Sequence, residues 1–433
     1  MQLQVILKIK IVVLSLVLLL STNVFAIETA NQNYKIDGSL ASPRPATDTI
    51  EWVYGDPLTT TSPTNFAPED RHDLRPVRAD DDYAQVTRIL RAAYSQPPAQ
   101  WPKPHLRPGV AHVELGSVRP ASFPENNPFT DAKAKLGQTL FFDGRLSGTG
   151  QMACASCHVA ELGWGDGRAR ALGHGVNQLA RNTPSLLNAG VQRELFWDGR
   201  AQSIERLVVE VLTNESEMRT TAEQLQAKLQ AIEGYRALFK EAFGDETVTM
   251  GRVAQAIATH VRTIVSEPSA EFDRFLAGEH DRLSDSAIRG LHLFRTNAGC
   301  LNCHNGPILS DGEFHNIGLH YFGRKYEDLG RYIVTQKPED VGRFRTPPLR
   351  NIARTAPYMH VGFFDLPGVI NMYNAGGSRP RPRPEFENNP LWPETSDLLV
   401  PLHLNDRDKE DLTAFLESLT ERRRRDLAPE LPR

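Results

Sequence analysis

Two copies of one short cysteine and histidine pattern carry the clearest chemistry in this sequence. The copies read CASCH and CLNCH, and their residues are Cys154, Cys157 and His158 in the first and Cys300, Cys303 and His304 in the second. Two thiols at this spacing can add to the two vinyl groups of one porphyrin, and the adjacent histidine can then bind the iron. The sequence has only these four cysteines. The pattern therefore predicts two covalently bound haem c groups, with two disulfides or a zinc site as the alternatives.

The N-terminus predicts export. Two lysines, Lys8 and Lys10, precede the apolar run Ile11–Leu20, and the small residue Ala26 completes a cleavage pattern. Residues 1–26 are therefore predicted to be a secretory signal peptide, which is too short to count as a membrane span. We see no other apolar stretch of spanning length, so we expect a mature periplasmic chain without a membrane span.

Bulk composition is that of an ordinary folded protein. Hydrophobic residues make up 40% of the chain, which is enough for ordinary cores, and the formal net charge is −4. This charge gives no reason to expect a nucleic acid partner. The length that remains after the signal peptide suggests roughly two to three domains.

A weak internal duplication places each haem motif after a helix. AKLGQTLFF (134–142) precedes the first motif and AIRGLHLFR (287–295) precedes the second, with Gly, Leu and Phe in register. We expect each to be a helix that leads into a haem-binding loop. A helix over 250–265 would close the first unit. A helix within 409–425 would close the second, with its arginine run at the helix C-terminus.

These elements predict a mostly α fold, with two cytochrome c-like haem domains in tandem after an N-terminal proline-rich extension. Proline and polar residues dominate the extension, which contains one amphipathic helix candidate over 81–94. The predicted segments after the signal peptide are 27–125 for the extension, 126–280 for the catalytic haem domain and 281–433 for the electron-transfer haem domain.

Longer motifs between residues 126 and 419 resemble the bacterial di-haem cytochrome c peroxidases and the related MauG enzymes. They are LFFDGRLS, RNTPSLLNA, LFWDGRA, ESEM and FRTPPLRNIARTAPYMHVG, in addition to the two haem motifs. The resemblance implies an oxidoreductase that reduces hydrogen peroxide, in which one haem meets the peroxide and the other stores or relays electrons. His158 would then bind the iron of the catalytic haem, and His304 the iron of the electron-transfer haem.

The resemblance also implies roles for three side chains. Trp197 in FWDGR matches the tryptophan that carries electrons between the haems, although a buried core tryptophan is the alternative. Glu217 in ESEM matches the acid that moves a proton between the peroxide oxygens. His174 in LGHGVN matches a histidine that caps the first haem iron in the resting peroxidases, but Gly173 and Gly175 also fit a plain mobile loop.

A calcium ion and several partners complete what the resemblance implies. Asn182, Thr355 and Pro357 match positions that bind calcium between the domains, with ordinary turn hydrogen bonding as the alternative. The implied partners are hydrogen peroxide and either a small redox protein, such as a cytochrome c or cupredoxin, or an oxidisable protein substrate. A homodimer is left open. Two other functions also stay open, namely a MauG-like maturase that oxidises a protein partner and a non-catalytic di-haem electron carrier.

The stretch NMYNAG places two iron-binding residue types side by side, Met372 and Tyr373. Asp365 can cap a helix and Pro367 can stand in its first turn, so we expect a helix over 366–374. One inward stripe on it has the spacing i, i+3, i+4 and i+7, and its members are Leu366, Val369, Ile370 and Tyr373. Met372 lies about 100° off that stripe.

The stripe favours Tyr373 as the residue that faces the second haem. The peroxidases resembled here have methionine at this place and MauG has tyrosine, provided that one residue is deleted after HVGF. A tyrosinate ligand should lower the haem potential, whereas methionine should raise it. The prediction is therefore ligation by His304 and Tyr373, with a core tyrosine beside a methionine-ligated haem as the alternative.

Overall fold

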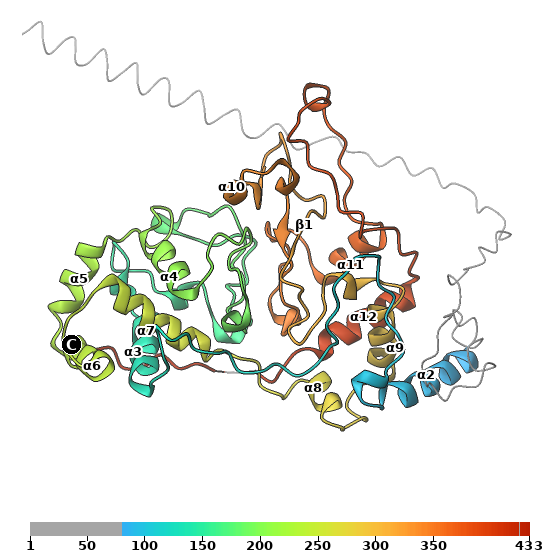
Figure 1. Ribbon diagram of the computed structural model, residues 1–433, viewed down its shortest axis with the longest axis horizontal. Coiled ribbons are helices and arrows are strands. Elements are labelled where there is room, and N and C mark those ends of the chain that lie inside the picture. Colours follow the sequence, from blue (N-terminus) through green and yellow to red (C-terminus); the bar gives the residue numbers. More distant parts are fainter. Residues whose placement is uncertain (1–79, 424) are drawn as a thin grey trace, which may run out of the picture. The chain divides into compact units, whose positions relative to one another are not determined.

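The computed structural model describes residues 80–423 and 425–433. The predicted signal peptide, residues 1–26, and residues 27–79 of the predicted extension lie outside the described residues. Most regular structure in the described part is helical (Figure 1). Two short strands, β1 (Phe314–His315) and β2 (Phe344–Arg345), form one antiparallel ladder. The predicted mostly α fold class is confirmed.

Large apolar side chains gather in two hydrophobic clusters. The helices of the first cluster are α3 (Asp131–Phe141), α4 (Ile204–Thr213), α5 (Ala222–Gln230), α6 (Glu233–Phe243) and α7 (Met250–Arg262). Those of the second are α2 (Asp80–Tyr94), α8 (Glu271–Leu276), α9 (Asp285–Arg295), α11 (Leu366–Asn374) and α12 (Asp406–Ser418). The short helix α10 (Tyr332–Thr335) has no buried residue. Each cluster contains one of the two haem motifs or packs against it.

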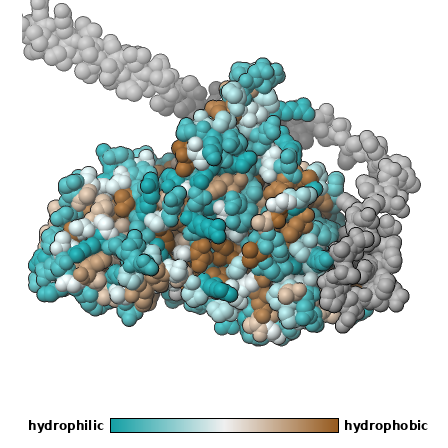
Figure 2. All heavy atoms as spheres, in the orientation of Figure 1, coloured by the Kyte–Doolittle hydropathy of each residue, from teal (hydrophilic) through white to brown (hydrophobic). Residues whose placement is uncertain are grey.

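Hydrophilic residues cover most of the face drawn in Figure 2, where hydrophobic residues form smaller groups. This is the surface expected when apolar side chains fill two interior clusters. Over the part of the chain that the structure describes, no helix combines the length and the apolar content needed to cross a bilayer.

One close helix crossing occurs in each cluster and explains the repeated glycine. Helix α3 packs on α7, and α9 packs on α12. A Cβ on Gly137 would overlap the carbonyl oxygen of Ala256, and a Cβ on Gly290 would overlap that of Asp411. Only glycine therefore lets each helix pair approach so closely. The duplication seen in the sequence corresponds to two equivalent helix crossings.

The described part of the predicted extension packs on the second cluster. Helix α2 covers the amphipathic segment predicted over 81–94 and ends at Tyr94. Leu90 and Tyr94 are buried in the second cluster together with Trp101 and Leu115. The guanidinium of Arg289 on α9 donates a hydrogen bond to the α2 residue Thr87 at 2.8 Å. These residues are thus part of a hydrophobic core, and the exact domain limits stay a prediction.

The arginine run near the C-terminus corrects one expectation. Helix α12 ends at Ser418, so the run that begins at Arg422 does not lie at the helix C-terminus, and that prediction was wrong. Glu421, which lies just after the end of the helix, is buried. The Glu421 carboxylate accepts hydrogen bonds from the side chain of Asn351 (3.0 Å) and the backbone N–H of Glu267 (2.7 Å). Hydrogen bonds from donors that are distant in the sequence hold the chain just after this end.

Candidate di-haem site

The two C-x-x-C-H motifs have the same local geometry. All four cysteines are free thiols, so the disulfide alternative has no support in the structure. Nδ1 of His158 lies 2.9 Å from the carbonyl oxygen of Trp164, and Nδ1 of His304 lies 3.1 Å from that of Leu309. A carbonyl oxygen can only accept, so each Nδ1 carries the proton and each Nε2 keeps its lone pair for a metal.

Burial also suits both histidines to iron ligation. The protein surroundings lower the pKa of His158 and of His304, because burial disfavours the charged imidazolium. Only the neutral ring can bind a metal. Two free thiols beside a neutral, correctly protonated histidine fit a covalently attached haem in each motif.

The charge of Glu217 acts on the first motif, and its role at the peroxide stays a prediction. Burial, followed by the charges of Asp166 and Glu217, raises the pKa of the Cys157 thiol to about 11, so the Glu217 carboxylate lies within electrostatic range of that sulfur. The carboxylate accepts a hydrogen bond from Nδ2 of Asn214 at 2.9 Å. Burial raises the pKa of Glu217 above its ordinary value, although Arg200 opposes this shift. Such a carboxyl can exchange a proton closer to neutral pH.

His174 reaches the same place from another loop. Its backbone N–H donates to the carbonyl oxygen of Ser216 at 2.8 Å, next to Glu217. Its Nε2 lies 3.0 Å from the guanidinium of Arg219, which can only donate. The carbonyl oxygen of Leu172 lies 3.9 Å from Sγ of Cys157. The structure thus brings His174 close to the first motif, but ligation would require its Nε2 to leave Arg219.

Trp197 lies at a contact between the part of the chain that carries the first haem motif and the part that carries the second. The indole N–H donates to the carbonyl oxygen of Asn182 at 2.9 Å. The carbonyl oxygen of Trp197 accepts from the backbone N–H of Arg345 at 2.8 Å. The indole ring meets the His360 ring edge to face, with centroids 6.2 Å apart. These contacts fix one orientation of the ring between the two segments, which is a placement that a relay requires.

The predicted calcium ligands lie close to the same contact. The backbone N–H of Asn182 donates to the carbonyl oxygen of His360 at 2.7 Å, and its Nδ2 donates to that of Arg168 at 2.7 Å. Asn182 is thus beside the segment that carries Thr355 and Pro357. The side-chain oxygen of Asn182 is the atom that a hard cation would use. Calcium binding stays a prediction.

Helix α11 has the bounds that the sequence predicts, residues 366–374. The Asp365 carboxylate accepts a hydrogen bond from the backbone N–H of Gly368 at 2.8 Å and so caps the helix. Pro367 stands in the first turn, where no hydrogen bond from its nitrogen is needed.

Tyr373 on α11 lies near the second haem motif. Burial, followed by the charges of Cys303 and Cys300, raises the pKa of its phenol, so the hydroxyl lies within electrostatic range of both sulfurs. Thioether sulfurs carry no charge, so with the haem attached burial is the main cause that raises the pKa of Tyr373. The structure therefore puts Tyr373 beside the second motif, as the helical stripe indicated. Which residue binds the iron stays a prediction.

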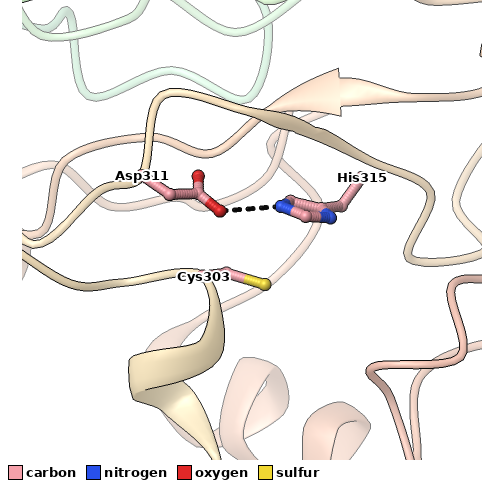
Figure 3. A group of neighbouring side chains, drawn as sticks. All are labelled: Cys303, Asp311 and His315. Atoms are coloured by element: carbon pink, nitrogen blue, oxygen red, sulfur yellow. Dashed lines mark hydrogen bonds and ion pairs between the residues drawn. The ribbon is translucent and has the colours of Figure 1, made fainter. Parts of the chain in front are cut away.

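A group that the sequence reasoning missed lies at the second motif and contains Cys303, Asp311 and His315 (Figure 3). Nε2 of His315 lies 2.8 Å from Oδ2 of Asp311. Burial would lower the pKa of His315, but the hydrogen bond to Asp311 and the Cys303 sulfur raise it to about 10. Because haem attachment uses the Cys303 sulfur, we interpret the other two as an ion pair beside the haem. Asp311 and His315 are four residues apart but do not lie on one helix, so the sequence did not indicate that they would meet.

Comparison with known proteins identifies the family. The sequence model of the family described as di-haem cytochrome c peroxidase matches residues 131–281. The chain is 35% identical over 339 residues to the cytochrome-c peroxidase IdrP1 of Pseudomonas sp. (strain SCT), which covers 72% of this chain and 86% of that protein. It is 38% identical over 329 residues to the methylamine utilization protein MauG of Methylorubrum extorquens, with coverages of 75% and 88%.

The fold is similar to that of a solved relative. The crystal structure of a MauG-like protein associated with microbial copper homeostasis gives a TM-score of 0.64 at 32% identity, over 70% of this chain and 93% of that chain. The chain belongs to the di-haem cytochrome c peroxidase family, to which MauG also belongs. Two haem c groups follow from this membership and from the two motifs.

Proposed function

We propose that the chain is an exported di-haem peroxidase, an oxidoreductase that reduces hydrogen peroxide with electrons passed between two haems. The observation that carries the proposal is a buried Glu217 carboxylate within electrostatic range of the Cys157 sulfur, supported by the fixed position of Trp197. Relatives at 35% and 38% identity are named cytochrome-c peroxidase and MauG. A pure electron carrier would need no acid beside the first motif.

His158 would hold the catalytic haem through Nε2, and the bound haem supplies the redox chemistry and the place where peroxide binds. Glu217 moves the proton. Its carboxylate takes a proton from the near oxygen of the peroxide and returns it to the far oxygen as the bond between the two oxygens breaks. The hydrogen bond from Asn214 orients the carboxylate for this transfer.

Reduction of one hydrogen peroxide to two waters consumes two electrons and two protons. The electrons come from a small redox protein, such as a cytochrome c or cupredoxin, or from an oxidisable protein substrate. Trp197 relays them between the haems, because its ring is held between the segments that carry the two motifs. His174 is a ligand candidate at the first iron only if it leaves Arg219.

Tyr373 is proposed as the second ligand of the haem held by His304, which puts this chain closer to the MauG branch. Ligation requires the phenol to lose its proton, which burial alone opposes. A nearby metal charge favours the anionic form and can reverse that effect. A tyrosinate ligand is what favours the second candidate function, a MauG-like maturase that oxidises a protein partner.

Export, calcium and assembly belong to the same proposal. Export to the periplasm rests on the pattern of residues 1–26 and calcium on Asn182, Thr355 and Pro357, while a homodimer is left open. Mass spectrometry of the mature protein should show two haem additions and loss of residues 1–26. A protein with intact disulfides and no haem would contradict the proposal.

The test of the function is a spectrum of the purified holoprotein with hydrogen peroxide, with and without reduced cytochrome c. A peroxidase should consume peroxide and oxidise the cytochrome. Poor turnover of the cytochrome with a long-lived oxidised spectrum would favour the maturase instead. Failure of the reduced protein to bind carbon monoxide would mean that neither haem is open, and the chain would be an electron carrier.

A further inference from the structure

Four arginines are buried in the described chain, and three of them have a carboxylate partner. These three ion pairs are Arg262 with Glu205 (2.6 Å), Arg350 with Asp273 (2.7 Å) and Arg295 with Glu114. A cation that loses its hydration on burial needs an opposite charge, because carbonyl dipoles replace water only in part. Arg345 is the exception.

Arg345 is 6% exposed and bonds only to carbonyl oxygens. Its Nε donates to the carbonyl oxygen of Phe196 at 3.2 Å, and a terminal nitrogen lies 3.4 Å from that of Thr346. Glu194 is the one acid of the described chain whose charge acts on it, and that carboxylate pairs with Arg331 at 2.7 Å. Burial lowers the pKa of Arg345 to about 10, so it stays charged at neutral pH.

The loop that follows the second haem motif packs against the backbone next to Arg345. The carbonyl oxygen of Thr346, which lies 3.4 Å from a terminal nitrogen of Arg345, accepts a hydrogen bond from Oγ of Ser310 at 2.7 Å. Ser310 follows Leu309, whose carbonyl oxygen lies 3.1 Å from Nδ1 of His304. In the register of β1 and β2, Arg345 stands opposite Phe314, so its side chain lies on the other face of the ladder from His315, which lies beside Cys303 (Figure 3). The backbone N–H of Arg345 also donates a hydrogen bond to the carbonyl oxygen of Trp197 at 2.8 Å. A missing anion at this position would therefore belong to a group bound at the second motif.

We propose that Arg345 binds a propionate carboxylate of the haem attached at Cys300 and Cys303. A haem carries two such carboxylates, and a guanidinium can bind one with two parallel N–H bonds. The propionate would neutralise Arg345 as acids neutralise the other buried arginines, and it would join the haem edge to the backbone that holds Trp197. The inference rests on the haem content of the proposed function and not on peroxide reduction.

The test compares three variants of the holoprotein. Arg345→Met removes the charge, Arg345→Lys keeps it but cannot form the two parallel bonds, and Arg343→Met removes a nearby charge whose side chain is 43% exposed. Two properties are measured, the propionate bending band in resonance Raman spectra and the reduction potential of each haem. Neither depends on peroxide turnover, so failure of the proposed activity would not be mistaken for failure of this inference.

Arg345→Met should shift the propionate band and lower the potential of the second haem, because an uncompensated propionate favours ferric iron. We expect a change of about tenfold in the reduction equilibrium, which is about 59 mV for a one-electron couple. Arg343→Met should change neither property. An unaltered band in Arg345→Met, or changes confined to the first haem, would overturn the inference. If Arg345→Met does not fold, an unaltered band in Arg345→Lys would overturn it.

Discussion

Glu217→Gln should abolish most peroxide turnover while preserving both haem spectra. Glutamine has nearly the same shape, and its amide oxygen can still accept the hydrogen bond that Asn214 donates at 2.9 Å. The loop beside Cys157 should therefore persist. Glutamine cannot take up and return a proton, so the loss should be the full contribution of a general acid-base group. That contribution is about 10²–10⁴-fold in rate, or roughly 3–5 kcal/mol in the barrier.

The assay is steady-state peroxide reduction across pH with a reduced small redox protein as donor. Glu217 must be ionised to accept the first proton, and burial raises its pKa. Wild-type activity should therefore fall as pH decreases through a value above the ordinary pKa of a glutamate, and Glu217→Gln should lack this acidic limb.

Glu215→Gln is the matched control. The Glu215 side chain is 81% exposed on the same loop and pairs with Arg219 at 2.8 Å. Exposed pairs of this kind contribute about 0–1 kcal/mol, so turnover should stay near the wild-type value. If Glu217→Gln also kept wild-type turnover with both haems attached, another group would move the proton and the assignment would be refuted.

Two further predictions concern stability and are measured by chemical denaturation of the holoprotein. Gly290→Ala should destabilise the protein by about 1–3 kcal/mol, because the new Cβ would overlap the carbonyl oxygen of Asp411. Gly251→Ala, where the nearest atom is 3.9 Å away, should instead stabilise it by up to about 1 kcal/mol, and equal effects would contradict this account of the crossing. Asp273→Asn should cost about 3–5 kcal/mol by leaving Arg350 buried without its hydrogen-bonded carboxylate, and an unchanged midpoint would contradict this.

Features that local sequence determines were predictable. The bounds of α11 followed from Asp365 and Pro367, because capping and proline placement act within one turn. The two haem motifs were equally predictable, because each places both thiols and the histidine within one short stretch of sequence. The helical repeat alone predicts that Tyr373 faces the second haem; its phenol lies within electrostatic range of the motif sulfurs, and iron ligation stays a prediction.

Features that depend on distant partners were not predictable. The end of α12 was misjudged because Glu421 is held by Asn351, which lies 70 residues away in the chain. His315 gave no signal until β1 placed it beside Cys303. Arg345 stands in a motif that the family resemblance emphasised, yet only its burial without an acid distinguishes it from an ordinary surface cation.

The identity of the ligand opposite His304 tests the central claim most directly. The measurement is the near-infrared spectrum of the oxidised holoprotein for the wild type, Met372→Leu and Tyr373→Met. The wild type and Met372→Leu should both lack the charge-transfer band of a methionine-ligated haem, and Tyr373→Met should gain it together with a higher potential of the second haem. A wild-type spectrum that shows this band, and its loss in Met372→Leu, would make Met372 the ligand and contradict the account.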